Sequence, residues 1–112
     1  MSAITTHVLD TAAGRPATGV PVRLELHAGE RGWMPLAHGV TGPDGRLRDL
    51  LAEGGKLDAG RYRLIFDTGA YLGVRGAFFP EVTVVFEVRD PNEHYHVPLL
   101  LSPFGYSTYR GS

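Results

Sequence analysis

Fifteen glycines and eight prolines are spread through the 112 residues and leave only short uninterrupted segments. Because both residue types break regular structure, long helices are disfavoured along the chain. The segments between them, most clearly 20–28, 61–67 and 82–89, alternate apolar and polar residues, which is typical of strands that bury one face. Their inward-facing residues are expected to be Val20, Val22, Leu24, Leu26, Tyr62, Leu64, Phe66, Val82, Val84, Phe86 and Val88.

Turn-forming residues separate these segments at 13–16, 42–45, 58–60 and 90–92. Seven or eight short strands at this spacing predict an all-β fold, an antiparallel β-sandwich that forms one domain over residues 1–112. Only 70–79 has a composition that allows a turn or two of helix, and Gly73 and Gly76 weaken that prediction.

The charge and the cysteine content exclude several classes of function. The formal net charge is −1, so nothing favours binding to nucleic acid or to an anionic membrane surface. The chain has no cysteine, which removes disulfides, thiolate catalysis and zinc–sulfur sites. The sequence contains no recognisable signal peptide or transmembrane segment, and we expect a soluble, cytoplasmic protein.

Five histidines are the first candidates for chemistry. His27 lies on the polar face of its segment and His38 lies near a turn, so both are expected to be solvated surface residues. His7 lies in an N-terminal strand and shares its face with Thr5 and Leu9.

His94 and His96 project from the same side of another strand, opposite an apolar face. Such a pair can chelate a metal ion. However, the sequence offers no third ligand at a suitable spacing, so we expect no metal site.

Arg46 and Arg48 follow a Pro-Asp-Gly turn and share one face if the segment is extended. One interpretation is a solvated pair on a short edge strand, where charge discourages aggregation. The other is a clamp for an anion or a carbonyl group, which suits the planar guanidinium. The sequence lacks a Gly-x-Ser-x-Gly motif, a phosphate-binding loop and paired carboxylates, so a covalent hydrolase is poorly supported.

The chain ends on "YSTYRGS", and its last four residues are either a cloning remnant or a strand end held in a site. The segment "HYHVPLLLSPFGYSTYRGS", with "THVLDTAAGRPATGVPVRLEL", "GVTGPDGR", "GRYRLIFDT" and "FFPEVTVVFEV", resembles the transthyretin-like 5-hydroxyisourate hydrolases. The resemblance runs from about residue 4 to the last residue, and the Tyr-Arg-Gly-Ser ending marks the hydrolases among transthyretin-like proteins. It implies that the tail is native and functional.

The resemblance also assigns residues to the site. The catalytic histidine of "THVLD" corresponds to His7, the arginine after "DG" to Arg46, and the histidine before "PLLLSP" to His96. We expect the two histidines to polarise the attacking water and Arg46 to bind the substrate; which histidine is the general base stays open. Arg48 and His94 receive no role from the motifs. The expected substrate-binding tail is Tyr109, Arg110, Gly111 and Ser112, the last with its terminal carboxylate shaping the pocket.

The implied reaction is the hydrolytic ring opening of 5-hydroxyisourate, the product of urate oxidation, to 2-oxo-4-hydroxy-4-carboxy-5-ureidoimidazoline, without a cofactor. The implied assembly is a homotetramer, a dimer of dimers with the sites where the dimers meet. One alternative is a non-catalytic transthyretin-like carrier of a small ligand. A carrier would not need a histidine pair, and it is disfavoured by the presence together of His7, Arg46, His96 and the tail. A second alternative is an accessory domain of a larger protein, which the compact length and the lack of a linker disfavour.

Overall fold

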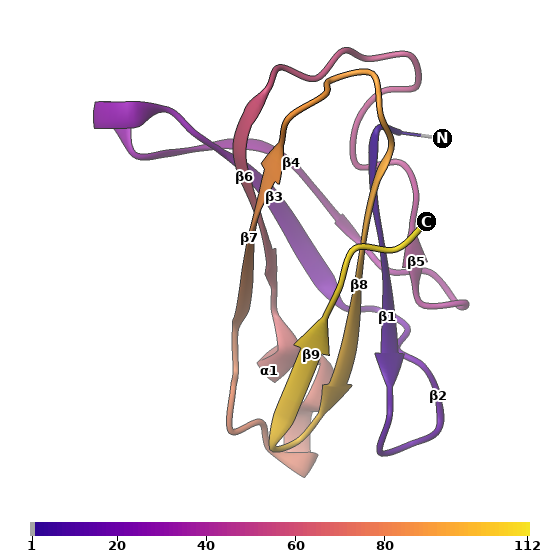
Figure 1. The fold of residues 1–112 in the computed structure, drawn as a ribbon. Helices are drawn as coiled ribbons and strands as arrows, with labels where there is room; N and C mark the ends of the chain where they lie inside the picture. Colours follow the sequence, from indigo (N-terminus) through magenta and orange to yellow (C-terminus); the bar gives the residue numbers. More distant parts are fainter. Residues whose placement is uncertain (1) are drawn as a thin grey trace.

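The computed structural model describes residues 2–112 as two β-sheets packed around one core (Figure 1). One sheet has the strand order β2-β1-β8-β9, with β5 also paired to β1, and the other has the order β4-β3-β6-β7. The all-β sandwich expected from the sequence is confirmed. The strands are β1 (Ile4–Asp10), β2 (Arg15–Pro16), β3 (Pro21–His27), β4 (Trp33–Val40), β5 (Arg46–Leu47), β6 (Gly60–Phe66), β7 (Val82–Val88), β8 (Tyr95–Ser102) and β9 (Gly105–Thr108).

One pair of strands departs from the expected antiparallel arrangement. β1 and β8 run parallel, from Ile4 opposite Tyr95 to Asp10 opposite Leu101, whereas the other pairs among residues 2–112 are antiparallel. The alternation of apolar and polar residues determines which face of a strand is buried, but not the direction of its neighbour. All four strands of the second sheet lie between β1 and β8 in the sequence. The chain can therefore return to the end of the sandwich where β1 begins, and β8 can start there and run parallel to β1 (Figure 1).

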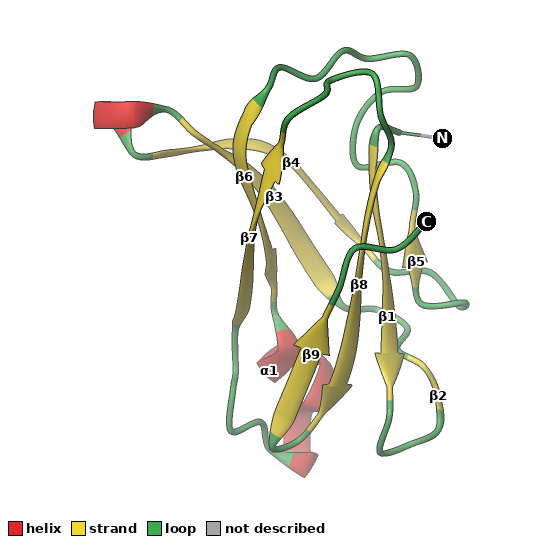
Figure 2. Ribbon diagram, in the orientation of Figure 1, coloured by secondary structure: helices red, strands yellow, loops and turns green. Residues whose placement is uncertain are grey.

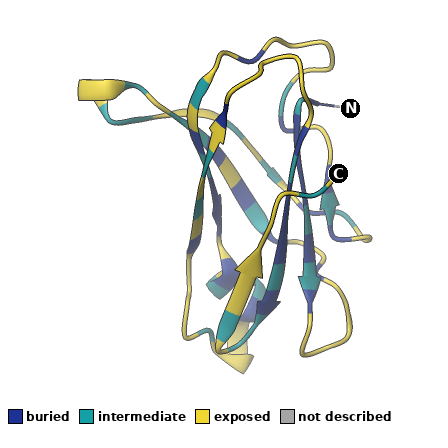
Figure 3. Cartoon of the chain, viewed as in Figure 1, coloured by how far each residue is buried: buried dark blue, intermediate teal, exposed yellow. Residues whose placement is uncertain are grey.

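The core consists largely of the residues that the alternation turns inward. Leu24 and Phe66 are fully buried, whereas Arg23, next to Leu24 in β3, is exposed. Figure 3 shows the resulting alternation of buried and exposed bands along β3. Complete burial of one such apolar side chain contributes about 1.5–3 kcal/mol to folding. The predicted inward set is confirmed, with three of its members only partly buried against the core: Leu26, Val84 and Phe86.

Among residues 2–112, helix is confined to short segments (Figure 2): η1 (Gly29–Arg31), α1 (Thr68–Leu72) and η2 (Gly73–Arg75). The helix expected within 70–79 therefore begins earlier, at Thr68. Asp67 causes this early start, because its side chain accepts a hydrogen bond from the Ala70 N–H at 3.0 Å and caps the first turn. Gly73, at a φ of +54°, ends the helix.

The end of β1 holds α1 and η2 through a buried carboxylate. The Asp10 side chain accepts hydrogen bonds from the Tyr71 hydroxyl at 2.8 Å and from the Arg75 guanidinium at 2.9 Å. Burial raises the pKa of Asp10. Hydrogen bonds from the Ala13 N–H, Tyr71 and Arg75, together with the charge of Arg75, lower this pKa by a larger amount, so that it lies below its usual value. The carboxylate is therefore ionised at neutral pH and ties β1 to the helical connection between β6 and β7.

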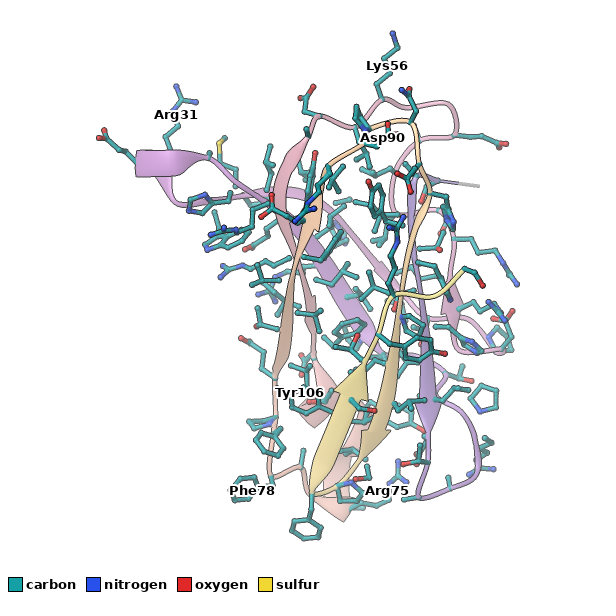
Figure 4. The ribbon with its side chains drawn as sticks, in the orientation of Figure 1. Arg31, Lys56, Arg75, Phe78, Asp90 and Tyr106 are labelled. Carbon is teal, nitrogen blue, oxygen red and sulfur yellow. The ribbon has the colours of Figure 1, made fainter. Side chains whose placement is uncertain are left out.

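The free edges β7 and β9 lie on the same side of the sandwich (Figures 1 and 2). Aromatic side chains collect at the end where these edges meet: the Phe79 ring lies 4.9 Å from Phe78 and 5.3 Å from Tyr106 (Figure 4). Phe78 and Tyr106 are exposed. Within residues 2–112, no helix is long and apolar enough to cross a membrane.

Candidate active site

The first sheet brings the predicted site residues together because β1 lies between β5 and β8. The pairing with β8 puts Thr5 opposite His96, and the pairing with β5 puts His7 opposite Arg46. Neighbouring strands lie about 4.8 Å apart, and residues two apart on a strand point to the same face. Side chains that are distant in sequence therefore meet over one face of this sheet.

The turn before Arg46 depends on Gly45, whose φ is +77°, a conformation that favours glycine. A Cβ at this position would lie 2.4 Å from the carbonyl oxygen of Val8, so no other residue fits. The Val8 N–H donates to the Gly45 carbonyl at 2.8 Å, and the Arg46 N–H donates to the Asp44 side chain at 3.0 Å. These bonds hold the turn against β1 and place Arg46 at the edge of the sheet.

A polar pocket of about 90 Å³ opens over these strands. Its lining residues are Thr5, Thr6, Arg46, Arg48, His94, His96 and Ser112. The guanidinium groups make the polar pocket a place for an anion or a polarised carbonyl oxygen. Arg48 also pairs with the Asp44 carboxylate at 3.2 Å. The hydrogen bond from the Arg46 N–H lowers the pKa of Asp44 below its usual value, and the charge of Arg48 contributes to this lowering.

His96 is half-buried in the polar pocket, and its Nδ1 lies 2.7 Å from the Thr5 hydroxyl. Burial lowers the pKa of His96, and the positive charge of Arg46 lowers it further; a hydrogen bond with the Thr5 backbone raises it by less, so the pKa lies below its usual value. The ring is therefore neutral at neutral pH. Thr5 lies at Nδ1, and within residues 2–112 no side chain forms a hydrogen bond with Nε2 of His96. Nε2 is therefore available to a bound molecule.

His94 shares the Thr5 hydroxyl with His96. Its Nε2 lies 3.1 Å from the Thr5 oxygen, and the two imidazole rings are nearly parallel, at 17°, with centroids 6.4 Å apart. The same-side projection predicted for His94 and His96 is confirmed, and the arrangement connects an exposed histidine to a half-buried one. Among residues 2–112, no group of three histidine, aspartate or glutamate side chains is placed to hold a metal ion.

His7 stands beside the polar pocket rather than in its lining. Its Nε2 lies 2.8 Å from the carbonyl oxygen of Asp44. Because a carbonyl only accepts, Nε2 carries the proton, and Nδ1 of the neutral ring keeps its lone pair. The other two histidines lie elsewhere: His27 is exposed and packs edge-on against Trp33, and His38 is exposed within β4.

After β9 ends, the tail pairs with β8 once more, in an antiparallel bridge between Gly111 and His96. The Gly111 N–H donates to the His96 carbonyl at 2.8 Å, and a Cβ at position 111 would lie 2.6 Å from Cδ2 of the His96 ring. Gly111 therefore lies directly against that ring, where a larger residue would displace it. Arg110 anchors this segment: its guanidinium bonds Glu93 at 3.0 Å and lies 4.6 Å from the centre of the Tyr95 ring.

The four tail residues divide between two hollows. Gly111 and Ser112 lie at the polar pocket, whereas Tyr109 and Arg110 line a groove of about 230 Å³ between the two free edges, called here the edge groove. Its other lining residues are Val84, Val85, Phe86, Glu87, Tyr95, Val97 and Thr108. The expected roles of Tyr109 and Arg110 in substrate binding stay predictions, because in one chain they do not reach the polar pocket.

The structure brings Arg46, His96 and Ser112 together and places His7 next to them. Sequence reasoning gave no role to Thr5, which the fold makes the hydrogen-bonding partner of two histidines. A signal was available, since Thr5 shares the face of His7. The missing information was the register between β1 and β8, which a single sequence does not contain.

Comparison with known proteins identifies the family of the chain. The model of the HIUase/Transthyretin family matches residues 4–111, so the chain belongs to that family and the resemblance found in the sequence is confirmed. The chain is 49% identical to the 5-hydroxyisourate hydrolase of Salmonella typhimurium over 111 residues, which are 97% of this chain and 80% of the relative.

Two solved structures have the same fold. Klebsiella pneumoniae 5-hydroxyisourate hydrolase superimposes with a TM-score of 0.84 at 38% identity, over 97% of this chain and 98% of the other. Sea bream transthyretin, solved in complex with thyroxine, superimposes with a TM-score of 0.88 at 34% identity, over 98% and 95%. Because a hydrolase and a transthyretin in complex with thyroxine fit almost equally well, the fold alone does not decide the function.

Proposed function

We propose that the protein hydrolyses 5-hydroxyisourate to 2-oxo-4-hydroxy-4-carboxy-5-ureidoimidazoline in urate degradation, and that the polar pocket is part of the active site. The observation that carries this proposal is the convergence of Arg46 from β5 and His96 from β8 on one pocket. The names of relatives at 46–49% identity support the substrate. The lining supports the chemistry, because hydrolysis of a cyclic acyl–nitrogen bond needs a base and a stabilised oxyanion.

In the proposed mechanism, Nε2 of His96 takes a proton from water as the water oxygen attacks the ring carbonyl carbon. Arg46 donates hydrogen bonds to the carbonyl oxygen as it becomes an oxyanion. The carbon–nitrogen bond then breaks, and the leaving nitrogen receives a proton from the histidine. The lowered pKa of His96 supports this role, since the ring must be neutral to accept the first proton.

His7 acts as the second member of the pair. Its Nε2–H is held by the Asp44 carbonyl, so the lone pair of Nδ1 is available to accept a hydrogen bond from the water or the substrate. His7 is paired with Arg46 across β1 and β5, which supports a position next to the bound substrate. The reaction as proposed needs no metal ion or organic cofactor.

We further propose a homotetramer, a dimer of dimers in which each site is completed by a second copy. The polar pocket of one chain measures about 90 Å³, whereas small-molecule sites usually measure about 300–1,000 Å³. A second chain facing the pocket would enclose the missing volume. The free edges β7 and β9, with exposed Val85 and Tyr106, offer a surface for the other contact.

A non-catalytic carrier of a small ligand is the second candidate, favoured by the close fit to transthyretin bound to thyroxine. Absorbance spectroscopy separates the two functions. Urate and urate oxidase generate 5-hydroxyisourate, whose absorbance decays slowly by itself. A hydrolase shortens this decay in proportion to its concentration, and we expect this result. A stoichiometric change without turnover would favour the carrier.

A further inference from the structure

A buried threonine joins the two imidazoles at the polar pocket. Thr5 is only 3% exposed, and its hydroxyl oxygen lies 2.7 Å from Nδ1 of His96 and 3.1 Å from Nε2 of His94. We propose that Thr5 and His94 form a proton relay behind His96, which stores the proton of the attacking water until the leaving nitrogen takes one. This inference rests on the proposed function, and it assigns roles to two residues that the family motifs leave unassigned.

The hydrogen-bond capacity of the threonine couples the two rings. A hydroxyl has one proton to donate, so Thr5 donates to one histidine and accepts from the other. If His94 donates to Thr5, then Thr5 donates to Nδ1 of His96, and Nε2 of His96 carries a proton and is no base. If Thr5 donates to His94, then His96 donates from Nδ1, and its Nε2 has a free lone pair. Only the second arrangement suits a general base.

The relay balances protons over both steps. An O–H bond of the water breaks as Nε2–H forms on His96; Nδ1–H passes to the Thr5 oxygen, and the Thr5 hydroxyl proton passes to Nε2 of His94. Thr5 is again a hydroxyl, His96 is neutral in its other tautomer, and His94 carries the charge. When Nε2 of His96 donates to the leaving nitrogen, the same bonds run in reverse, and the resting arrangement returns.

The surroundings favour moving the charge from His96 to His94. His96 is half-buried beside Arg46, and both effects disfavour its charged form, whereas His94 is exposed to water. The backbone at both rings is fixed by the tail: Gly111 bonds the His96 carbonyl at 2.8 Å and Arg110 the His94 carbonyl at 3.4 Å. The donor and acceptor atoms are therefore already in place for the transfer.

The test compares Thr5→Val, which keeps the side-chain shape without the hydroxyl, with Thr5→Ser, which keeps the hydroxyl. We expect Thr5→Val to lower kcat roughly 10–100-fold, toward the low end of general acid–base effects, with KM little changed, and Thr5→Ser to restore most of the rate. His94→Gln should cause a similar loss, since an amide accepts the hydrogen bond but not the proton. Thr11→Val, which loses a hydroxyl bond to the Leu101 carbonyl, and His27→Gln are matched controls expected to keep the full rate.

A second readout does not depend on activity. Nitrogen-15 NMR of the histidine rings should find neutral His96 protonated at Nδ1, and Thr5→Val should shift it toward the Nε2 tautomer. A Thr5→Val protein with full kcat and an unchanged His96 tautomer would overturn the relay alone. An Nε2–H tautomer in the wild type would overturn the relay together with the role of Nε2 of His96 as general base, but not the hydrolysis itself. An inactive wild-type protein would instead overturn the proposed function, and with it any role of the relay in hydrolysis.

Discussion

The polar pocket and the edge groove lie on the same molecule, share the tail, and differ in almost every other property. The polar pocket is small and lined by histidines, arginines and threonines, whereas the edge groove is larger and lined mainly by valines and aromatic residues from β7, β8 and the tail. Charged groups that converge on a small volume suit chemistry. Apolar residues along two unpaired edges suit association with another chain. The tail links the two, because Arg110 anchors it at the groove and Gly111 packs against His96.

The largest expected effect belongs to the polar pocket. Arg46→Ala removes the group proposed to bind the oxyanion, so kcat/KM for 5-hydroxyisourate should fall by about 10²–10³, as at other oxyanion sites. His7→Ala should lower the rate by at least tens of fold. Thermal unfolding of both variants should stay close to that of the wild type, because both side chains lie at the surface of the sheet. His38→Ala is the control, and a comparable loss there would show that the pocket has no special role.

The next effect tests the link between the two regions. Gly111→Ala places a Cβ 2.6 Å from the His96 ring and must displace either the ring or the tail. A displacement of about 1 Å in a catalytic group can cost roughly 100-fold in rate. The melting temperature should change little, since tail residues bury little core. Gly105→Ala is the matched control, because its Cβ would meet only the Ser102 hydroxyl, at 3.8 Å. Equal rates for the two variants would contradict the proposed packing.

The sequence predicts which face of a strand is buried, but not the strand direction, the register or the path of the tail. The period-two alternation of residues such as Val22 and Leu24 predicts the buried face, because side chains on a strand alternate between its two sides. The parallel pairing of β1 and β8 is not predictable in this way, since alternation carries no direction. The role of Thr5 depends on that register. The division of the tail between two hollows depends on the path of the chain after β9, where no periodic pattern continues.

The edge groove should govern assembly more than chemistry. Val85 on β7 is 52% exposed, and Val85→Lys puts a charge on the free edge, which should weaken association. Light scattering should find a lower mass than the tetramer expected from 12.2 kDa chains. Val74→Lys, at a fully exposed position in η2, should leave the mass unchanged. A wild-type protein that is active as a monomer would contradict a site completed by a second copy.

The smallest effect concerns pH. The pKa of His96 lies below its usual value of 6.5, because of burial and then of Arg46, so His96 stays neutral and active to a lower pH than an ordinary histidine. The acid limb of kcat/KM should therefore lie below pH 6.5. Arg46→Ala removes a positive charge and should move this limb to higher pH, whereas Arg46→Lys should move it less. A limb that stays in place in all three proteins would show that His96 is not the group that titrates.

Hydrolysis at the polar pocket through His96 can be tested directly. The most direct test is the initial rate of 5-hydroxyisourate decay, measured by absorbance for the wild type, His96→Gln and His27→Gln at equal protein concentration. We expect His27→Gln to equal the wild type and His96→Gln to be slower by about 10² or more, as for loss of a positioned proton-transfer group. An active wild type with His96→Gln within twofold of its rate would show that His96 does not take part in the hydrolysis.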